Sequence, residues 1–171
     1  EEQRDFIKSA LGPKFKESGL DQVKIYLFDH NYNYDNISSE QDYVGKIYKD
    51  KEAESYVAGA AFHNYGGNRE ELNRVHDSYP NKELIFTETS IGEWNDGKNL
   101  SKRLMEDMAE VALGTVNNWC KAVVVWNLML DSEKGPNRDG GCQTCYGAVT
   151  LDKGDCKTIT RNSHYYIIGH L

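Results

Sequence analysis

The chain has 171 residues, a formal net charge of −7 at pH 7 and 39% hydrophobic residues. This length suffices for one domain with a substantial buried core. Its 20 Lys and Arg residues are scattered along the chain, which argues against a nucleic-acid-binding surface. No apolar run approaches the roughly 18 residues that a membrane span requires.

The first third of the chain predicts a helix, a strand and a second helix. Helical spacing of apolar residues begins near Arg4 and is expected to break at Gly12-Pro13. The β-rich run 23–28 predicts a short strand. The segment 38–56 predicts a single helix with a Ser N-cap and acidic residues in its first turn.

The rest of the chain continues this alternation of strands and helices. Strands are predicted at 56–62, 83–88 and 121–130, and helices at 68–79 (ending before Pro80), 99–119 and 162–171. The helix 99–119 is expected to present one apolar face, made of Leu104, Met105, Met108, Val111 and Ala112. A loop of about thirty residues follows the fourth strand, and loops of that length are usually functional or disordered.

The spacing of these elements indicates the fold class. A strand and a helix recur every thirty or so residues, which is the rhythm of βα units. The strands are uniform apolar runs rather than alternating ones, which is typical of strands covered on both faces. The sequence therefore predicts an α/β fold with a parallel sheet flanked by helices.

Polar and aromatic side chains follow each of the four predicted strands. Ligands of parallel α/β folds bind at the carboxyl ends of the strands, so these side chains are candidates for a shared site. Any single one has an ordinary explanation, since a polar residue must end any strand. The candidates are Asp29 and His30 after the first strand, His63, Asn64 and Tyr65 after the second, Glu88 after the third, and Trp126 and Asn127 after the fourth.

The chemistry of such a site can be narrowed. No Gly-rich phosphate loop follows a strand, and Ser90 lacks a G-x-S-x-G setting, which disfavours nucleotide binding and acyl transfer. No His pair at metal-ligand spacing is present, so neither a metal nor another cofactor is expected. A carboxylate such as Glu88, flanked by aromatic and amide groups, suits glycoside hydrolysis. The alternative is an ordinary surface charge at the end of a strand.

The four cysteines indicate structure rather than catalysis. Cys142 and Cys145 form a C-x-x-C in a Gly-rich loop, without the second ligand pair of a zinc site or the helix of a thioredoxin-like site. A disulfide is plausible if the protein is exported. Cys120 is expected to be buried and inert, and Cys156 is expected to be unpaired.

Seven segments carry a resemblance to glycoside hydrolase family 30, which includes glucosylceramidases and endo-β-1,6-glucanases. In chain order they are EEQRDFIKSALGP, VKIYLFDHN, AAFHNYGG, LIFTETSIGEW, VVVWNLMLDSEKGPN, GAVTLD and ITRNSHYYIIGH. The resemblance implies a retaining mechanism on a (β/α)8 barrel with a side β-domain. It aligns Glu88 with the catalytic nucleophile at the end of barrel strand seven. The implied substrate-binding residues are Asp29, His30, His63, Asn64, Tyr65, Trp94, Trp126 and Asn127.

One departure from the family pattern bears on function. The family's acid/base Glu lies in an Asn-Glu-Pro motif at the end of strand four, and this chain has no such motif. The resemblance therefore implies that residues 1–171 are the second half of the barrel, strands five to eight, without the first half or the side domain. We expect such a half-barrel to be inactive alone.

Several expectations about partners follow. The ligand is expected to be a β-linked glycan or glycoside, and the protein partners the missing barrel half or a second copy of the half-barrel, since unpaired parallel edges invite pairing. No nucleic acid or membrane span is expected, and the parent protein is expected to be secreted or periplasmic. The alternative function is a non-catalytic carbohydrate-binding half-barrel.

Overall fold

The computed structural model describes residues 1–171, which divide into two compact units. The first unit contains Glu1–Phe86 and Asn118–Ala122, and the second contains Thr87–Asn117 and Val123–Leu171.

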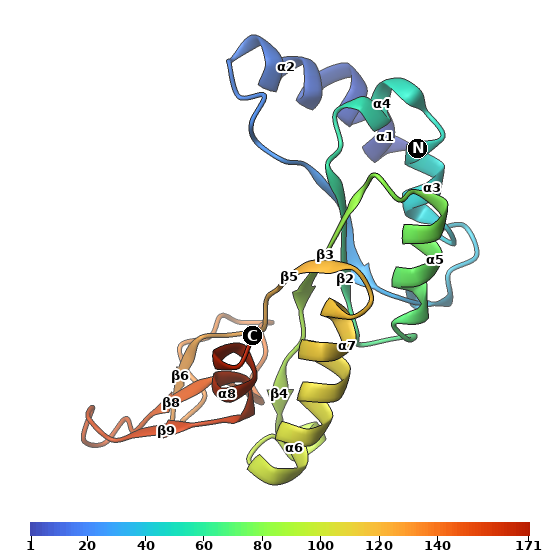
Figure 1. The fold of residues 1–171 in the computed structure, drawn as a ribbon. Coiled ribbons are helices and arrows are strands. Elements are labelled where there is room, and N and C mark those ends of the chain that lie inside the picture. Colours follow the sequence, from blue (N-terminus) through green and yellow to red (C-terminus); the bar gives the residue numbers. More distant parts are fainter. The chain divides into compact units, whose positions relative to one another are not determined.

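A four-stranded sheet forms the centre of the first unit (Figure 1). Its strands are β1 (Tyr26–Asn31), β2 (Gly59–His63), β3 (Glu83–Glu88) and β5 (Cys120–Val123), in the order β1-β2-β3-β5. β1 and β2 pair in parallel, and every residue of β2 is buried, as its apolar run predicts. The predicted α/β class is confirmed, and β3 has the predicted bounds.

Close backbone packing explains the glycine that begins β2. A Cβ atom on Gly59 would lie 2.1 Å from the carbonyl oxygen of Glu83, which is far inside van der Waals contact. Only glycine lets the start of β3 approach β2 this closely. The backbone N–H of Glu83 donates to the Ala58 carbonyl at 3.0 Å, which fixes the register there.

The first helix runs through Gly12-Pro13, so the predicted break there is wrong. It consists of α1 (Glu2–Phe6), a π-helical turn η1 (Ile7–Leu11) and α2 (Gly12–Glu17). The wider turn lets Gly12 N–H donate to the Ile7 carbonyl, five residues back, and Pro13 then occupies the first turn of α2. Because the helix is continuous, Pro13 omits one hydrogen bond to the preceding turn, and the wider π-helical turn is where the helix accommodates the proline without ending.

The single helix predicted over 38–56 is instead two short helices. They are α3 (Tyr43–Tyr48) and α4 (Lys51–Ser55), and no serine caps the first. Asp50 separates them, because its carboxylate accepts hydrogen bonds from the backbone N–H groups of Glu52 and Ala53 and so begins a new helix. The strand predicted at 23–28 begins three residues later, at Tyr26.

The first unit contains two further elements, a predicted helix and a short turn. The helix α5 (Glu70–Ser78) ends before Pro80 as predicted. A 3-10 turn η2 (Tyr34–Asn36) follows β1. None of the helices in the chain combines the length and apolar character that crossing a membrane requires.

The longest helix lies in the second unit and is continuous, and four of the five residues of the predicted apolar face are buried or half-buried. It consists of α6 (Leu100–Asp107), the π-helical turn η4 (Met108–Ala112) and α7 (Leu113–Val116). Val111 and Ala112 of that face are buried, together with Asp107 and Thr115, whereas Met105 is 74% exposed. The π turn adds one residue, so the buried positions beyond it are rotated relative to a constant helical period.

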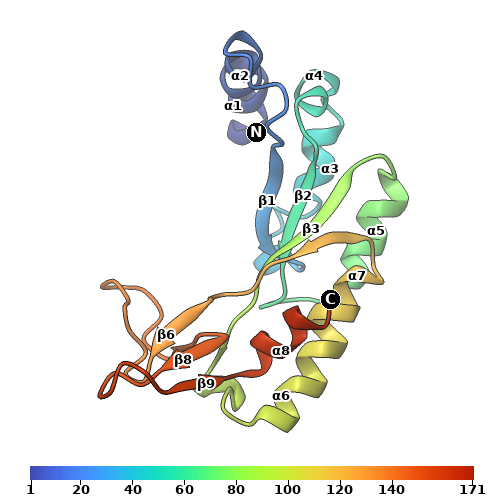
Figure 2. The same cartoon turned by 60° about the vertical axis from the view of Figure 1, so that its left-hand side comes forward.

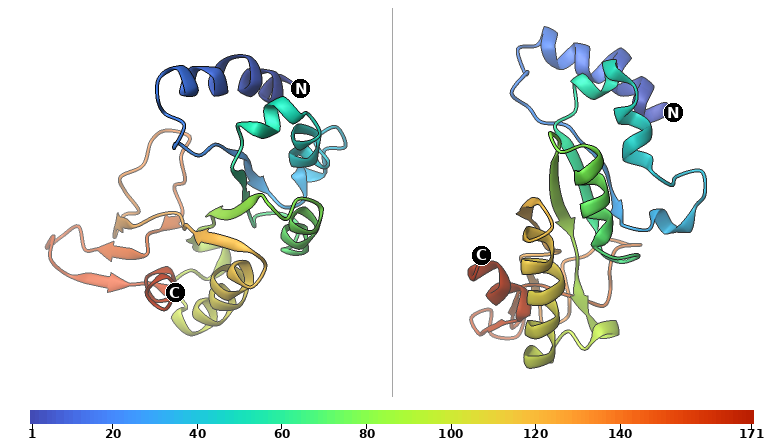
Figure 3. Two further views of the ribbon diagram at one scale, coloured as in Figure 1. Left: turned by 45° about the horizontal axis from the view of Figure 1, so that its top comes forward. Right: turned by 45° about the vertical axis from the view of Figure 1, so that its right-hand side comes forward.

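The apolar run 121–130 is not one strand. It ends as a strand at Val123, and Met129–Asp131 forms β6 in another sheet with β8 (Val149–Leu151) and β9 (Ile159–Arg161). A further antiparallel pair joins β4 (Ile91–Gly92) to β7 (Cys145–Tyr146). The loop expected to lack structure therefore contains several short strands, seen in orange and red in Figure 3.

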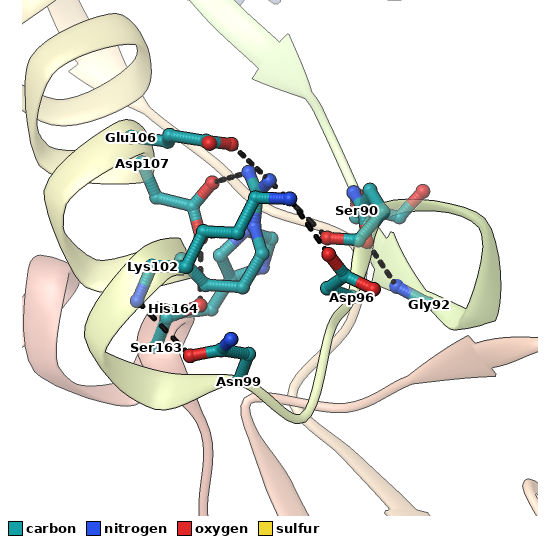
Figure 4. A network of polar contacts seen from close by, with 11 residues as sticks. Ser90, Gly92, Asp96, Asn99, Lys102, Glu106, Asp107, Ser163 and His164 are labelled. Carbon is teal, nitrogen blue, oxygen red and sulfur yellow. Dashed lines mark hydrogen bonds and ion pairs between the residues drawn. The ribbon is translucent and has the colours of Figure 1, made fainter.

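The last helix, α8 (Ser163–Gly169), forms as predicted and lies against α6 (Figure 2). A buried polar cluster joins the two helices (Figure 4). The carboxylate of Asp107 accepts a hydrogen bond from Ser163 Oγ at 2.6 Å and another from the Arg103 guanidinium. His164 lies beside this cluster, fully buried, with neither ring nitrogen hydrogen-bonded.

Candidate active site

The first group of candidate residues lies where β1 bends. Phe28 and Asp29 have left-handed backbone angles, with φ of 75° and 56°, and the pairing with β2 shifts between Phe28 and His30. Such a bulge redirects side chains at the end of a strand. Asp29 and His30 therefore lie within β1 rather than after it.

This bend brings together residues from two strands. His63 Nε2 lies 3.1 Å from Asp29 Oδ1, and the rings of His30 and His63 are 5.9 Å apart. The Tyr65 ring stands edge-on to His63 at 6.2 Å and is 47% exposed. Asn64, between them, is partly exposed. The structure thus clusters the five candidates predicted from the first two strands.

Asp35 belongs to this cluster and was missed by sequence reasoning. Its carboxylate is 2.6 Å from His30 Nε2 and accepts a hydrogen bond from Asn31 Nδ2 at 2.8 Å. The Asn31 amide, followed by His30, holds the pKa of Asp35 below its usual value. Asn31 also accepts a hydrogen bond from the Tyr65 backbone N–H at 3.2 Å. The sequence signal that could have revealed Asp35 is the run of amides and aromatics in HNYNYDN.

A second group of candidate residues contains Glu88, which occupies its predicted position at the end of the third strand. It is the last residue of β3 and is half-buried. The chain that follows it pairs with the chain after β5: Trp126 N–H donates to the Thr89 carbonyl at 2.7 Å, and Ser90 and Trp126 form a parallel bridge. Trp126 is therefore held next to Glu88 along the backbone, with 46% of its surface exposed.

Trp94 lies on the turn that follows β4. Its ring lies over Gly92, where a Cβ atom would be 1.9 Å from a ring carbon. The Asn95 amide fixes this turn, because it accepts from Gly92 N–H at 2.9 Å and donates to the Ser90 carbonyl at 3.2 Å. Trp94 is 53% exposed, so its ring is available for contact.

The second unit also contains the loop that follows Asn127. Cys142 and Cys145 form a disulfide, and Cys145 lies in β7 opposite Gly92. The loop is thereby linked to the segment that follows Glu88. The carbonyl of Asn127 accepts from Ala148 N–H at 2.8 Å, whereas its side-chain oxygen is buried without a partner.

The two remaining cysteines differ in exposure. Cys120 is buried as expected, and burial raises the pKa of its thiol to about 12, which disfavours the reactive thiolate. Cys156 is exposed and unpaired. No group of three or more His, Cys, Asp or Glu side chains is arranged to hold a metal ion.

In each unit, polar and aromatic side chains lie at or after the ends of strands, which is where ligands of parallel α/β folds bind. The chain matches the model of the glycosyl hydrolase family 30 TIM-barrel domain over residues 1–171. It therefore belongs to glycosyl hydrolase family 30.

Curated relatives of the chain are glycosidases. The endo-1,6-β-D-glucanase BGN16.3 of Trichoderma harzianum is 31% identical over 98% of this chain, which covers 31% of that protein. The lysosomal acid glucosylceramidase of Mus musculus is 30% identical over 80% of this chain and 27% of its own length. The chain spans less than a third of these relatives.

Solved structures show the same relationship. The endo-β1,6-glucanase BT3312 is 71% identical, with a TM-score of 0.97 over 99% of this chain and 37% of that one. SrfJ from Salmonella typhimurium is 25% identical, with a TM-score of 0.84 over 98% of this chain and 36% of that one.

Proposed function

We propose that this chain is the nucleophile-bearing half of the catalytic barrel of a retaining β-glycosidase that hydrolyses β-1,6-glucan. The observation that carries the proposal is the 71% identity with the endo-β1,6-glucanase BT3312 over nearly the whole chain. The Trichoderma relative is named for the same linkage. The glucosylceramidase supports glycosidase chemistry but matches less of the chain, so a lipid glycoside is the weaker candidate substrate.

Glu88 is the proposed nucleophile. One of its carboxylate oxygens attacks the anomeric carbon, the bond from that carbon to the leaving oxygen breaks, and the leaving oxygen takes a proton from an acid. Water then hydrolyses the glycosyl ester and regenerates Glu88. Its place at the end of β3, half-buried and next to Trp126 along the backbone, supports this role.

The acid is expected to come from the rest of the barrel. Retaining enzymes need a second carboxyl group about 5–5.5 Å from the nucleophile, and the chain lacks the Asn-Glu-Pro motif that would supply it. Glu93 is a poor substitute, because its carboxylate is paired with Lys134. We therefore propose that residues 1–171 are inactive alone.

The other candidates are proposed to bind the sugar. Half-exposed indole rings suit the apolar faces of pyranoses, and a set of imidazole, amide, phenol and carboxylate groups suits their hydroxyls. Trp94 and Trp126 supply the rings. The polar groups are those of Asp29, His30, His63, Asn64, Tyr65 and Asn127.

Two features support the assignment of the chain to strands five to eight of a barrel. β5 is the last strand in the order of its sheet, so one of its edges is available for pairing. In the second unit, a largely apolar cavity of about 590 Å³ lies between residues 123–128 and α8. Val124, which lines it, is 52% exposed. The first barrel half is the proposed cover for both.

The test uses a polypeptide that carries the whole barrel. A mechanism-based β-glucoside inhibitor should leave a glycosyl adduct on the peptide that contains Glu88, located by mass spectrometry. Glu88→Gln should lower kcat/KM for β-1,6-glucan by at least roughly three orders of magnitude. The matched control is Glu83→Gln at the other end of β3, where Lys24, Tyr26 and Lys121 hold the pKa of the carboxyl near 2; it should stay active.

Other outcomes would identify other functions. Activity of Glu88→Gln above a tenth of the unmodified level would exclude the nucleophile role. Glycan binding without turnover or adduct, equally strong in Glu88→Gln, would identify the carbohydrate-binding alternative. Hydrolysis of glucosylceramide but not of β-1,6-glucan would overturn the proposed substrate.

A further inference from the structure

Asp35 has no role in the mechanism above, although its carboxylate lies between two side chains from the end of β1. One oxygen is 2.6 Å from His30 Nε2, and the other accepts a hydrogen bond from Asn31 Nδ2 at 2.8 Å. Asn31 is buried, whereas the side chains of His30 and Asp35 are each 44% exposed. All three residues belong to the first unit. Asp35 therefore joins a buried amide to an accessible imidazole.

The chain adopts an uncommon backbone conformation to place this carboxylate. Tyr34, Asp35 and Asn36 have consecutive left-handed φ angles of 53°, 50° and 59°, which residues other than glycine rarely adopt. Asn33 Oδ1 holds the turn by accepting from the Asp35 backbone N–H at 3.1 Å. Tyr34 is buried and its hydroxyl donates to Glu71. The position of Asp35 is thus set by the turn that carries it.

A contribution to stability does not account for this arrangement. Both members of the pair are close to half exposed, and water screens such pairs so that they stabilise a fold little. Left-handed angles at residues other than glycine cost free energy, and they are concentrated at functional sites. The geometry therefore indicates that Asp35 orients His30.

The hydrogen bonds determine which nitrogen of His30 carries the proton. The Tyr65 backbone N–H donates to Asn31 Oδ1 at 3.2 Å, so Asn31 presents its NH2 group to Asp35. The Asn31 amide and His30 lower the pKa of Asp35, and an ionised carboxylate only accepts. His30 Nε2 must therefore donate, which leaves Nδ1 of the neutral ring as an acceptor. No group in the chain donates to that Nδ1.

We propose that Asp35 is a positioning residue, which fixes His30 in the tautomer whose Nδ1 accepts a hydrogen bond from a sugar hydroxyl of the glycan. Sugar hydroxyls donate as well as accept, so an accessible acceptor nitrogen is complementary to them. Asp35 acts through His30. The inference rests on the proposed function, since it requires that a glycan binds at His30.

Asp35→Asn in a polypeptide with the whole barrel tests this role. Asparagine tolerates left-handed backbone angles, so the turn should persist with an unchanged melting temperature. The new amide oxygen still accepts from Asn31, so the new NH2 group meets His30 Nε2, which must then accept while Nδ1 carries the proton. KM for β-1,6-glucan should rise about fivefold with little change in kcat, the effect of one hydrogen bond lost from ground state and transition state alike.

The tautomer itself is measured by 15N NMR of protein labelled at its histidines, in mildly alkaline buffer where an ordinary imidazole is neutral. Protonated and unprotonated ring nitrogens have distinct 15N shifts, and His30→Ala identifies the His30 signals. The proton should be on Nε2 in the unmodified protein and on Nδ1 in Asp35→Asn. The matched control is Asp42→Asn, a second aspartate of the first unit with a left-handed φ (55°), which pairs with Arg74. It should change neither the tautomer nor KM.

A double variant shows whether Asp35 acts through His30. In a His30→Ala background, Asp35→Asn should change KM by no more than about twofold, because the imidazole that it orients is gone. A fivefold rise in both backgrounds would mean that Asp35 acts by another route, and the proposal would be wrong.

The outcomes separate the two proposals. If the unmodified enzyme does not hydrolyse β-1,6-glucan, the proposed function fails whatever the tautomer of His30. If it does, the role of Asp35 is overturned by a proton on Nδ1 in the unmodified protein, by an unaltered tautomer in Asp35→Asn, or by an unchanged KM in that variant.

Discussion

The cluster that joins α6 to α8 predicts a specific loss of stability in acid. His164 is fully buried, and its Nε2 lies 3.7 Å from Asp107 Oδ2, beyond hydrogen-bond distance. Burial, with a smaller contribution from Arg103, lowers the pKa of His164 to about 4, against the opposing effect of Asp107. The imidazole is therefore neutral in the folded protein at neutral pH.

The sign of the effect follows from this depressed pKa. Above about pH 6.5 the side chain is neutral in the folded and unfolded states, so it does not change the free energy of unfolding. As the pH falls from about 6.5 to about 4, the unfolded chain binds a proton that the folded chain excludes. The free energy of unfolding should therefore fall by about 2 kcal/mol at pH 5 and by about 3 kcal/mol in total.

Urea unfolding of the whole-barrel protein between pH 7.5 and pH 4.5 measures this effect. His164→Leu removes the titrating group without removing a hydrogen bond, since neither ring nitrogen has a partner. The free energy of unfolding of the parent minus that of His164→Leu should fall by about 2 kcal/mol between pH 7 and pH 5. Carboxyl titrations common to both proteins cancel in this difference. His170→Leu, an exposed histidine at the end of the same helix, is the control and should keep the parent's slope.

A parent and a His164→Leu variant with identical pH dependence would refute the reasoning. That result would mean that His164 binds its proton equally well in both states, so that burial does not disfavour the charged imidazole. A stronger pH dependence in the variant would likewise contradict it.

Three further outcomes are expected. Trp126→Ala should lower kcat/KM for β-1,6-glucan about tenfold or more and cost less than the roughly 3–5 kcal/mol of a buried Trp, because the ring is 46% exposed; a full core penalty with normal kinetics would contradict this. Replacing both Cys142 and Cys145 with Ser should cost up to about 2 kcal/mol, since the closed loop is short, and should also lower kcat/KM for β-1,6-glucan, because the loop is linked through β7 to the segment after Glu88. Purified residues 1–171 should show no glycoside turnover and should self-associate in sedimentation velocity; an active monomer would contradict both expectations.

The sequence predicted the elements that local patterns determine. β3 and α8 are uniform runs with clear boundaries, and α5 ends at a proline, so periodicity and chain breakers were sufficient. The π-helical turns were not predictable, because a helix with one extra residue per turn has the same composition as a regular helix. In the first helix the π turn stands directly before Gly12-Pro13, where the sequence predicted a break.

The prediction of a single strand over 121–130 was wrong for a different reason. An apolar pattern reports that residues avoid water but not which sheet they join, so β5 and β6 could not be separated. The sequence predicted five members of the cluster around His63 but not Asp35. Asp35 joins it through a backbone with left-handed angles at Tyr34, Asp35 and Asn36 as well as at Phe28 and Asp29, and such angles are uncommon for these residues.

The disulfide loop contacts the segment that follows the proposed nucleophile. The segment after Glu88 is held by Trp126 through Thr89, by β7 through Gly92, and by Lys134 through Glu93. The last two of these contacts also set the ends of the disulfide loop. A displacement of the loop therefore acts on the segment beside the proposed nucleophile. This coupling is why we expect loss of the disulfide to lower kcat/KM for β-1,6-glucan and not only the stability of the fold.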